Sequence, residues 1–414
     1  NGYVRSEGVA VMMLRRLSDA QRDGLPILGV IRGTGVNHGG RGISLFAPNA
    51  TAQARLIADV LANSTLDPAS LTAVEAHGTG TTVGDPIEVE GLKRGFQTAV
   101  ENHGGVEPAQ GQIALSSVKS WIGHCEVAAG MAGLIKLVME MRDGVLIPDA
   151  PRRAVNPAIR LAGTPFRLLD HVELWQPLRD NAGNPLPRRA GISSFGFGGV
   201  NAHAVIEQAP VAVGPARPAT GPEVIVLSAQ SAQALRATAQ ALLTFVEAGP
   251  DTGLDSLATT LQTGRNALRY RLAFVARSVQ EVAETLSAFV QDRPDGRWMQ
   301  AVARQDGPNA AATTDPQQIA TAWINGQTVT WPRRPAGLSR LRLPPTAMDL
   351  RRCWFAPESA ALAPPPTPTV PAPRLMAQNE QDSLRYDALF DGSASFVRDH
   401  LVQGQPILPG MAYA

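Results

Sequence analysis

Three short segments put small residues beside a histidine, hydroxyl, amide or aromatic group, and each follows a short apolar run in the first half of this 414-residue chain. They occupy 75–81 (EAHGTGT), 117–124 (SVKSWIGH) and 195–203 (FGFGGVNAH). Glycine lets a ligand approach the backbone closely, and a preceding strand holds the loop still. One such loop would mean little, but three of them in one stretch predict parts of a single catalytic cavity.

Two histidines and a lysine stand out within these segments. His77 follows a strand expected at 71–75, and His124 follows strand-like residues at 113–118. Lys119 lies five positions before His124. A lone histidine is more often an ordinary polar residue at a strand end, and that interpretation stays open for each of them. The small-residue-rich stretch 127–138 predicts a helix packed in a core, so this region is expected to be α/β.

These strings resemble the C-terminal half of the ketosynthase of modular type I polyketide synthases, a member of the thiolase-fold condensing enzymes. The resemblance covers residues 1–208 and includes all three segments. It implies catalytic roles for His77, His124 and Lys119. It also implies substrate-binding roles for Thr79, Thr81, Phe195, Phe197, Gly198 and Gly199.

The reaction that the resemblance implies is a decarboxylative Claisen condensation. Thr79 and Thr81 would contact the phosphopantetheine arm of an acyl carrier protein, which brings the malonyl unit as substrate; no bound cofactor and no metal is expected. The two imidazoles would stabilise the enolate, since one lost donor of this kind typically costs about 100- to 1000-fold in rate. Lys119 would orient and polarise the pair. Phe197 would exclude water.

The nucleophilic cysteine of the family is expected upstream of Asn1. Cys125 follows His124 directly, but adjacent side chains on such a turn point apart, so we expect a small buried filler there. Cys353 has no partner in sequence, and two such cysteines fit a reducing cytoplasm. Trp121 and Val200 depart from the residues that the family usually has, which affects the shape of the acyl pocket and not the proton-transfer groups.

Three glutamates, Glu75, Glu88 and Glu126, flank the expected site. A structural role and a catalytic role are both open for each of them. The net charge of +1 gives no basic excess for nucleic acid or an anionic membrane. No run reaches the roughly 18 apolar residues of a membrane-spanning helix. The length predicts two to three domains.

Residues 209–355 are expected to form a second, smaller domain after a Pro/Ala-rich passage that ends at Pro222. Strands at 224–227 and 270–275 alternate with helices at 231–246, around 257–261 and at 279–290. This pattern resembles the small α/β linker domain that follows such ketosynthases, and 318–345 resembles the peptide that wraps back across that linker and the ketosynthase.

No acyltransferase is expected within this chain. Such a domain needs on the order of 300 residues, about twice the number between 209 and 355, and a Gly-x-Ser-x-Gly elbow that is found nowhere in the sequence. The module is therefore expected to be of the trans-acyltransferase type, loaded by a discrete malonyltransferase.

The end of the chain divides into a Pro/Ala-rich linker at 356–383 and a new apolar segment at 384–414. His400, Gly404 and Pro409 form an H-x3-G-x4-P pattern that resembles the start of a polyketide synthase dehydratase with a hotdog-type fold. His400 would be its general base. In isolation the pattern is short, and a plain linker is the alternative.

The favoured interpretation is an elongating ketosynthase, dimeric through the ketosynthase, that works with acyl carrier protein domains. The alternative from another class is a non-elongating ketosynthase that acts as a transacylating gate or scaffold. Loss of the first histidine commonly disables such domains, and His77 is present. A stand-alone fatty-acid condensing enzyme is disfavoured because it would end near Gln208.

Overall fold

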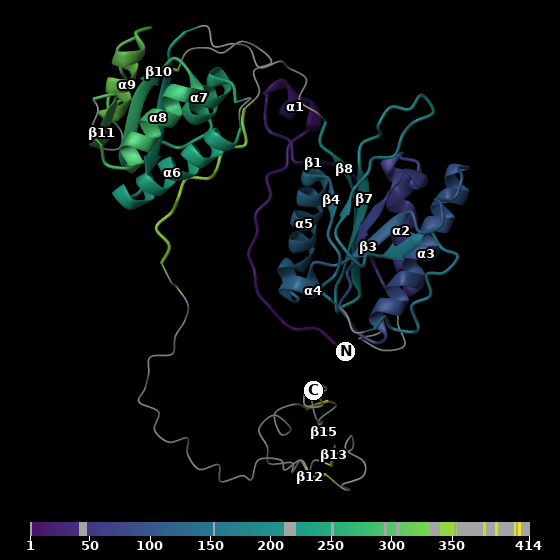
Figure 1. Cartoon of the computed structure of the whole chain (residues 1–414). Coiled ribbons are helices and arrows are strands. Elements are labelled where there is room, and N and C mark those ends of the chain that lie inside the picture. The colour runs from purple at the N-terminus through teal and green to yellow at the C-terminus, as the bar shows by residue number, and fades with distance from the viewer. Residues whose placement is uncertain are drawn as a thin grey trace. The chain divides into compact units, whose positions relative to one another are not determined.

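The fold is described from a computed structural model, shown in Figure 1. It describes residues 2–40, 48–151, 154–210, 221–249, 252–293, 296–303, 307–331, 340–351 and 353, and the backbone of four two-residue strands further along. Residues 1–349 form one compact unit and residues 350–414 form a second.

A six-stranded mixed sheet lies at the centre of the first half of the chain. Its spatial order is β1 (Gly29–His38), β8 (Val200–Gln208), β7 (Arg189–Phe195), β2 (Ala73–Glu75), β3 (Ile113–Ser116) and β5 (Phe166–Leu168). The pairs β1–β8 and β8–β7 are antiparallel, whereas β7, β2, β3 and β5 run parallel to one another. The carboxyl ends of β7, β2 and β3 therefore meet at one edge of the sheet.

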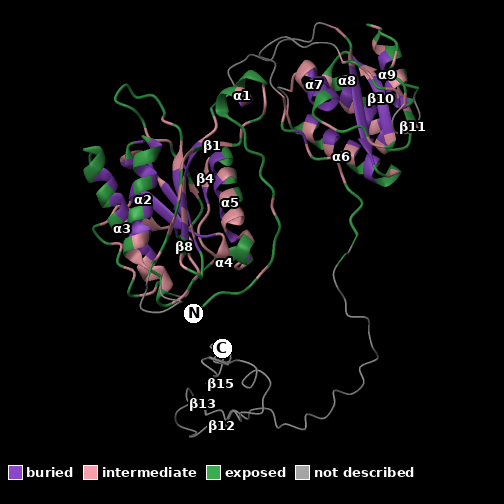
Figure 2. Ribbon diagram, turned by 180° about the vertical axis from the view of Figure 1, so that it is seen from behind, coloured by how far each residue is buried: buried purple, intermediate pink, exposed green. Residues whose placement is uncertain are grey.

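Helices cover both faces of this sheet. As Figure 1 shows, α2 (Ala50–Ser64) and α3 (Gly84–His103) lie on one face and α5 (Ala129–Asp143) lies on the other. Successive residues of a strand point to opposite faces. Val74 accordingly joins the core under α2 and α3, whereas its neighbour Ala73 joins the core under α5. The strands between the helices are buried, as Figure 2 shows.

Close approach of α2 to the sheet depends on glycines in β1. A Cβ atom at Gly35 would lie 2.6 Å from Cγ2 of Val60, and one at Gly33 would lie 2.8 Å from the Val60 carbonyl oxygen. The helix starts at Asn49, whose side chain accepts the backbone N–H groups of the first turn. The smaller elements of this half are α1 (Leu17–Arg22), η1 (Pro68–Ser70), α4 (Lys119–Ile122), η2 (Glu126–Ala128), β4 (Val145–Leu146) and β6 (Glu173–Leu174).

Several elements differ from the sequence expectation in extent, and two of the differences lie at the catalytic loops. The strand expected to reach Val118 ends at Ser116, because the N–H of Ser117 donates to Asp149 and that of Val118 donates to Glu75. Side-chain carboxylates thus replace the neighbouring strand as acceptors. The helix expected at 127–138 starts with the short η2 turn and continues as α5 to residue 143.

A separate small α/β domain follows. It consists of β9 (Glu223–Ala229), α6 (Ala232–Ala248), α7 (Leu254–Thr263), β10 (Tyr270–Ala276), α8 (Val279–Val290), β11 (Trp298–Val302) and α9 (Pro316–Ile324). The strands form an antiparallel sheet in the order β11-β10-β9. Consecutive residues along β9 are buried, so both faces of that strand are covered. Ser231 caps α6 by accepting the N–H of Ala234, as its place in the sequence predicts.

Residues 340–349 lie against this domain without forming a helix or strand. The N–H of Leu341 donates to Oγ1 of Thr260 at 2.9 Å, and the N–H of Ala347 donates to Oγ1 of Thr238 at 3.0 Å. The path that was expected to wrap back thus crosses the linker domain at these residues. The domain boundaries expected at 208, 355 and 383 stay predictions.

Of residues 350–414 little is described. The backbone pairs β12 (Met376–Ala377) with β13 (Tyr386–Asp387), and β14 (Leu401–Val402) with β15 (Gln405–Pro406), both antiparallel. His400, Gly404 and Pro409 lie outside the described residues. The hotdog-type dehydratase expected at 384–414 therefore stays a prediction.

Candidate active site

The segments 75–81, 117–124 and 195–203 converge at the edge of the sheet where β2, β3 and β7 end. Each segment follows one of these parallel strands directly, so their carboxyl ends bring the segments together. A cavity of about 870 Å³ lies there. Its lining includes His77, Thr79, Thr81, His124, Phe195, Phe197, Gly198 and Gly199. All three segments therefore contribute side chains to this cavity.

A second cavity of about 630 Å³ adjoins the first and contains Lys119. Both cavities are lined by Tyr3, Thr79 and Glu88, so they share a wall. The structure thus brings together every candidate site residue except His400, which lies outside the described residues.

The two imidazoles face one another. The ring centroids of His77 and His124 are 5.7 Å apart, with the planes at 86°. The ring of Phe195 lies 5.7 Å from that of His77 on another side. An atom of a bound substrate can therefore meet N–H groups from both rings, which is the arrangement that an oxyanion needs.

His77 is neutral at ordinary pH. Burial, together with the positive charges of Lys119 and His124, lowers the pKa of its imidazole to about 3. Nδ1 of His77 is buried and has no hydrogen-bond partner among the described residues. A neutral imidazole carries one N–H, so this ring can donate a hydrogen bond but does not deliver a proton readily.

The tautomer of His124 follows from its backbone surroundings. The N–H of Glu126 donates to Nδ1 of His124 at 2.9 Å. Nδ1 is therefore an acceptor, and the proton of the neutral ring resides on Nε2. Burial and the charge of Lys119 lower the pKa of His124. The backbone N–H of His124 donates to the Val4 carbonyl at 2.7 Å, which fixes the residue to the N-terminal segment.

Glu88 holds the loop that carries His77. Its carboxylate accepts the N–H of His77 at 2.7 Å and the N–H of Gly78 at 2.9 Å. Burial raises the pKa of Glu88 to about 7, although both N–H groups favour the charged form. The loop turns at Gly78, where φ is +47° and a Cβ atom would lie 2.7 Å from Cβ of Ser117. Of the two roles left open for Glu88, the structure shows the structural one.

Lys119 opens the short helix α4 and is close enough to both imidazoles to lower the pKa of each. Burial lowers the pKa of its own ammonium, and the carboxylates of Glu88 and Glu75 counteract that shift. A partly buried cation thus lies near the two neutral imidazoles. Its positive charge can stabilise an enolate oxygen there.

The expected substrate-binding residues divide into two groups. Oγ1 of Thr79 and Oγ1 of Thr81 lie 3.2 Å apart, and both line the larger cavity. Phe195 is buried, whereas the side chain of Phe197 is 71% exposed at the mouth. Sequence reasoning missed His38, which lies 3.0 Å through Nε2 from the Gly198 carbonyl. The pairing of β1 with β8 puts His38 opposite Val200, and this pairing joins residues that are distant in the sequence.

Neither cysteine is placed to act as the nucleophile. Cys125 is buried, with Sγ 3.2 Å from Oγ of Ser6, and it lines neither cavity. That agrees with a small buried filler. Cys353 is exposed. Trp121 lines the second cavity and donates from Nε1 to the Pro148 carbonyl at 2.8 Å.

Two family comparisons bear on this geometry. Residues 28–152 match the beta-ketoacyl synthase C-terminal domain, and residues 226–293 match the RhiE-like KS-MAT linker domain. This chain contains the C-terminal domain of a ketosynthase. The ketosynthase part has the C-terminal half of a thiolase fold, with the linker domain after it.

The ketosynthase and its linker are homologous to polyketide synthases. Polyketide synthase PksN of Bacillus subtilis is 35% identical over 445 residues, and polyketide synthase ThaG of Burkholderia thailandensis is 36% identical over 444 residues. Each match covers 100% of this chain and 8% of the relative. The chain therefore spans less than a tenth of these relatives.

Solved ketosynthases have the same fold. The oxazolomycin ketosynthase domain of Streptomyces albus is 38% identical with a TM-score of 0.72, over 82% of this chain and 57% of that one. The ketosynthase from module 6 of the bacillaene synthase of Bacillus subtilis is 31% identical with a TM-score of 0.67, over 80% of this chain and 59% of that one.

Within the ranges given above, no helix has the length and apolar character needed to cross a membrane. Nor do three or more His, Cys, Asp or Glu side chains of these ranges gather as a metal site would require.

Proposed function

We propose that this ketosynthase extends a polyketide chain by decarboxylative Claisen condensation. The observation that carries the proposal is the pair of neutral imidazoles of His77 and His124, 5.7 Å apart between ring centroids, in the cavity where the three loops meet. Neutral N–H donors stabilise a developing oxyanion without protonating it. That property suits a step whose intermediate has to stay an enolate.

The growing acyl chain is held as a thioester on a cysteine outside this chain, since neither Cys125 nor Cys353 is placed for that role. A malonyl thioester on the phosphopantetheine arm of an acyl carrier protein enters the cavity. The hydroxyls of Thr79 and Thr81 are 3.2 Å apart, a spacing at which both can contact the amide groups of the arm.

Carbon dioxide leaves as the bond between the malonyl carboxyl carbon and the α-carbon breaks. The electron pair of that bond forms an enolate, whose oxygen accepts hydrogen bonds from His77 and from Nε2–H of His124. Lys119 adds the positive field. The α-carbon then attacks the acyl carbonyl, the carbon–sulfur bond breaks, and the cysteine departs as a thiolate. Phe197, exposed at the mouth, excludes water while the enolate exists.

The extender unit is supplied by a discrete malonyltransferase, as in a trans-acyltransferase system. The support is in the sequence, because a linker domain follows the ketosynthase and no Gly-x-Ser-x-Gly elbow occurs anywhere in the chain. We also propose that the ketosynthase is a cytoplasmic homodimer.

A dehydratase follows in the same protein. The support is the H-x3-G-x4-P pattern from His400 to Pro409, with His400 as the base that removes a proton from the carbon alpha to the thioester. Replacing His400 by Phe in the intact protein should cause β-hydroxyacyl chains to accumulate on the carrier. An unchanged enoyl product would contradict this assignment.

The condensation itself is tested on the intact parent protein with its carrier in the malonyl form. We expect acylated ketosynthase to yield one β-ketoacyl carrier and one carbon dioxide per turnover, with both observed by mass spectrometry and isotope release. Transfer of the unextended acyl chain to the carrier, without carbon dioxide, would instead identify a non-elongating gate. His103→Ala, an exposed histidine at the end of α3, serves as a matched control for histidine variants.

A further inference from the structure

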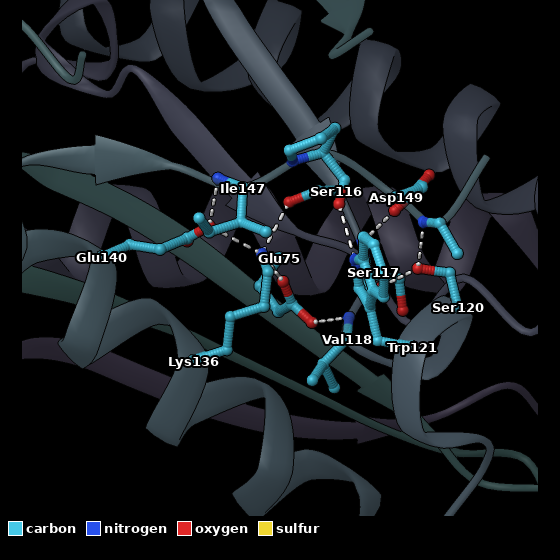
Figure 3. A network of polar contacts seen from close by, with 12 residues as sticks. Glu75, Ser116, Ser117, Val118, Ser120, Trp121, Lys136, Glu140, Ile147 and Asp149 are labelled. Atoms are coloured by element: carbon cyan, nitrogen blue, oxygen red, sulfur yellow. Dashed lines mark hydrogen bonds and ion pairs between the residues drawn. The ribbon is translucent and has the colours of Figure 1, made fainter. Parts of the chain in front are cut away.

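A cluster of buried charges lies behind the catalytic loops, as Figure 3 shows. Nζ of Lys136 is 2.8 Å from Oε2 of Glu75, 3.0 Å from Oε1 of Glu140 and 2.8 Å from Oγ of Ser116. The Glu75 and Glu140 side chains are 2% and 4% exposed, and that of Lys136 is 10% exposed. Burying an ion costs several kcal/mol, and pairing offsets this cost only where the geometry is good. Stability alone therefore gives little reason for buried ions at this place.

The two oxygens of Glu75 have different partners. Oε2 binds Lys136, whereas Oε1 accepts the N–H of Val118 at 2.7 Å. Val118 directly precedes Lys119, and Glu75 itself lies two positions before His77. One carboxylate therefore ties the strand that ends at His77 to the segment that carries Lys119.

The other side of the Lys119 segment is fixed independently. The N–H of Ser117 donates to Oδ1 of Asp149 at 2.8 Å, and Nε1 of Trp121 donates to the Pro148 carbonyl at 2.8 Å. Figure 3 shows these contacts on the far side of the segment from Glu75. Beyond the backbone pairing of β2 with β3, which ends at Ser116, the Glu75 carboxylate is the contact that joins this segment to β2 at Val118.

Several charged groups face Lys119 from the elements packed around it. They are Glu88 and Asp85 of α3, Glu75 of β2, His77, and His124 with Cys125 after α4. Glu75 and Glu88 both favour the protonated ammonium of Lys119. Glu75 also contacts the backbone next to Lys119, whereas Glu140 accepts the N–H of Ile147.

We propose that Glu75, held by Lys136, is a positioning residue that fixes the segment carrying Lys119 against the loop of the catalytic His77. The inference rests on the proposed condensation and deepens it. It assigns a task in that reaction to a pair of residues, 61 positions apart, that touch neither cavity opening nor substrate.

The matched variants are Glu75→Gln and Glu140→Gln, made in the intact parent protein. An amide offers one acceptor oxygen. Glu75 uses both oxygens as acceptors, so Gln at 75 loses either Lys136 or Val118. Glu140 accepts from Lys136 and from the N–H of Ile147 with the same oxygen, so Gln at 140 retains both contacts. The two variants remove the same charge from the same cluster.

The readout is the pH profile of malonyl decarboxylation, alongside acylation of the ketosynthase. For Glu75→Gln we expect a loss of about tenfold or more at pH 8, because a small misplacement of a catalytic group has effects of this size. Its basic limb should move to lower pH, since removing a nearby negative charge lowers the pKa of an ammonium. Acylation should be unchanged, and Glu140→Gln should retain the wild-type profile.

An unchanged profile for Glu75→Gln would overturn the proposal, as would equal losses in the two variants, which would show a general structural role. If Glu75→Gln fails to fold, Lys136→Met combined with Glu140→Gln keeps the net charge of the cluster and leaves Glu75 without its cation. Because Glu75 then lacks the cation that holds it, decarboxylation at pH 8 is expected to fall about tenfold or more with acylation unchanged. Decarboxylation at the wild-type rate overturns the proposal. Failure of the proposed function is distinguishable, because the wild type itself would then release no carbon dioxide.

Discussion

The carboxylate of Glu88 accepts the backbone N–H of His77 at 2.7 Å, and its other oxygen accepts the N–H of Gly78 at 2.9 Å. A buried side chain of α3 thereby holds the backbone of the loop that presents the first imidazole. Both donors lie on consecutive residues of that loop. The position of His77 is therefore set by a residue eleven positions later in the chain.

Glu88→Gln should weaken this hold. The amide has a single acceptor oxygen, so one N–H would face an NH₂ group and remain unsatisfied, at a cost of about 1–3 kcal/mol. We expect condensation to fall about tenfold or more, since misplacing a catalytic group has effects of that size. Turnover of the intact protein measures this. Glu90→Gln, on the same helix but paired with Arg94 near the surface, should behave as the wild type; equal activity of the two variants would refute the role of Glu88.

Gly78→Ala should disturb the same loop through its backbone. The new Cβ would lie 2.7 Å from Cβ of Ser117, and φ is +47°, where an L-residue costs about 1–2 kcal/mol. Gly183→Ala is the control, because its φ is +83° but nothing lies within 4 Å of the added carbon. We expect condensation to be lost in the first variant and retained in the second. Normal turnover of Gly78→Ala would show that the loop tolerates displacement.

The stability of the ketosynthase should decrease on acidification, in part because of His203. This residue is 2% exposed, and burial lowers its pKa to about 4. Between pH 6.5 and pH 4 the unfolded chain binds a proton at this residue that the folded chain does not. The free energy of unfolding thus falls as pH falls through that window, by about 3 kcal/mol from this group.

Denaturant unfolding at pH 7 and pH 4.5 tests this for the wild type and for His203→Gln. The variant should lose less stability between the two pH values than the wild type does. The exposed His103→Gln should lose as much as the wild type. If His203→Gln and the wild type lose equal amounts, His203 titrates normally in the folded protein.

Loading of the extender unit should require a second protein. Holo protein incubated with malonyl-CoA alone should leave its carrier unacylated, because no serine elbow occurs in this chain. Adding a discrete malonyltransferase should restore the malonyl carrier, as detected by mass spectrometry. Loading at a comparable rate without it would contradict the trans-acting proposal, unless the parent protein has a transferase domain elsewhere.

Much of the site was predictable because its parts are local in sequence. His77, Lys119 and His124 each lie in a short segment that follows a buried strand. The parallel pairing of β2 with β3 and β7 brings these segments to one edge of the sheet. The extent of α8 and the places of strands β9 and β10 also followed from apolar periodicity. These features depend on patterns a few residues long.

The rest depends on contacts between distant residues. Three contacts join segments that no periodicity connects. They are the ion pair of Glu75 with Lys136, the hydrogen bonds from the His77 loop to Glu88, and the contact of His38 with Gly198. The proton on Nε2 of His124 follows from a backbone donor at Glu126, which only the folded loop reveals. Strand β3 likewise ends at Ser116, because the carboxylates of Asp149 and Glu75 accept the N–H groups of Ser117 and Val118.

The most direct test of the central claim separates acylation from decarboxylation in His77→Ala. Intact protein is offered an acyl donor and labelled malonyl carrier, and the acyl-enzyme and released carbon dioxide are measured together. His77 stabilises the enolate and does not activate the nucleophile, so we predict normal acyl-enzyme and a loss of carbon dioxide release of about 100-fold or more. Carbon dioxide release and condensation at the wild-type rate would contradict the account.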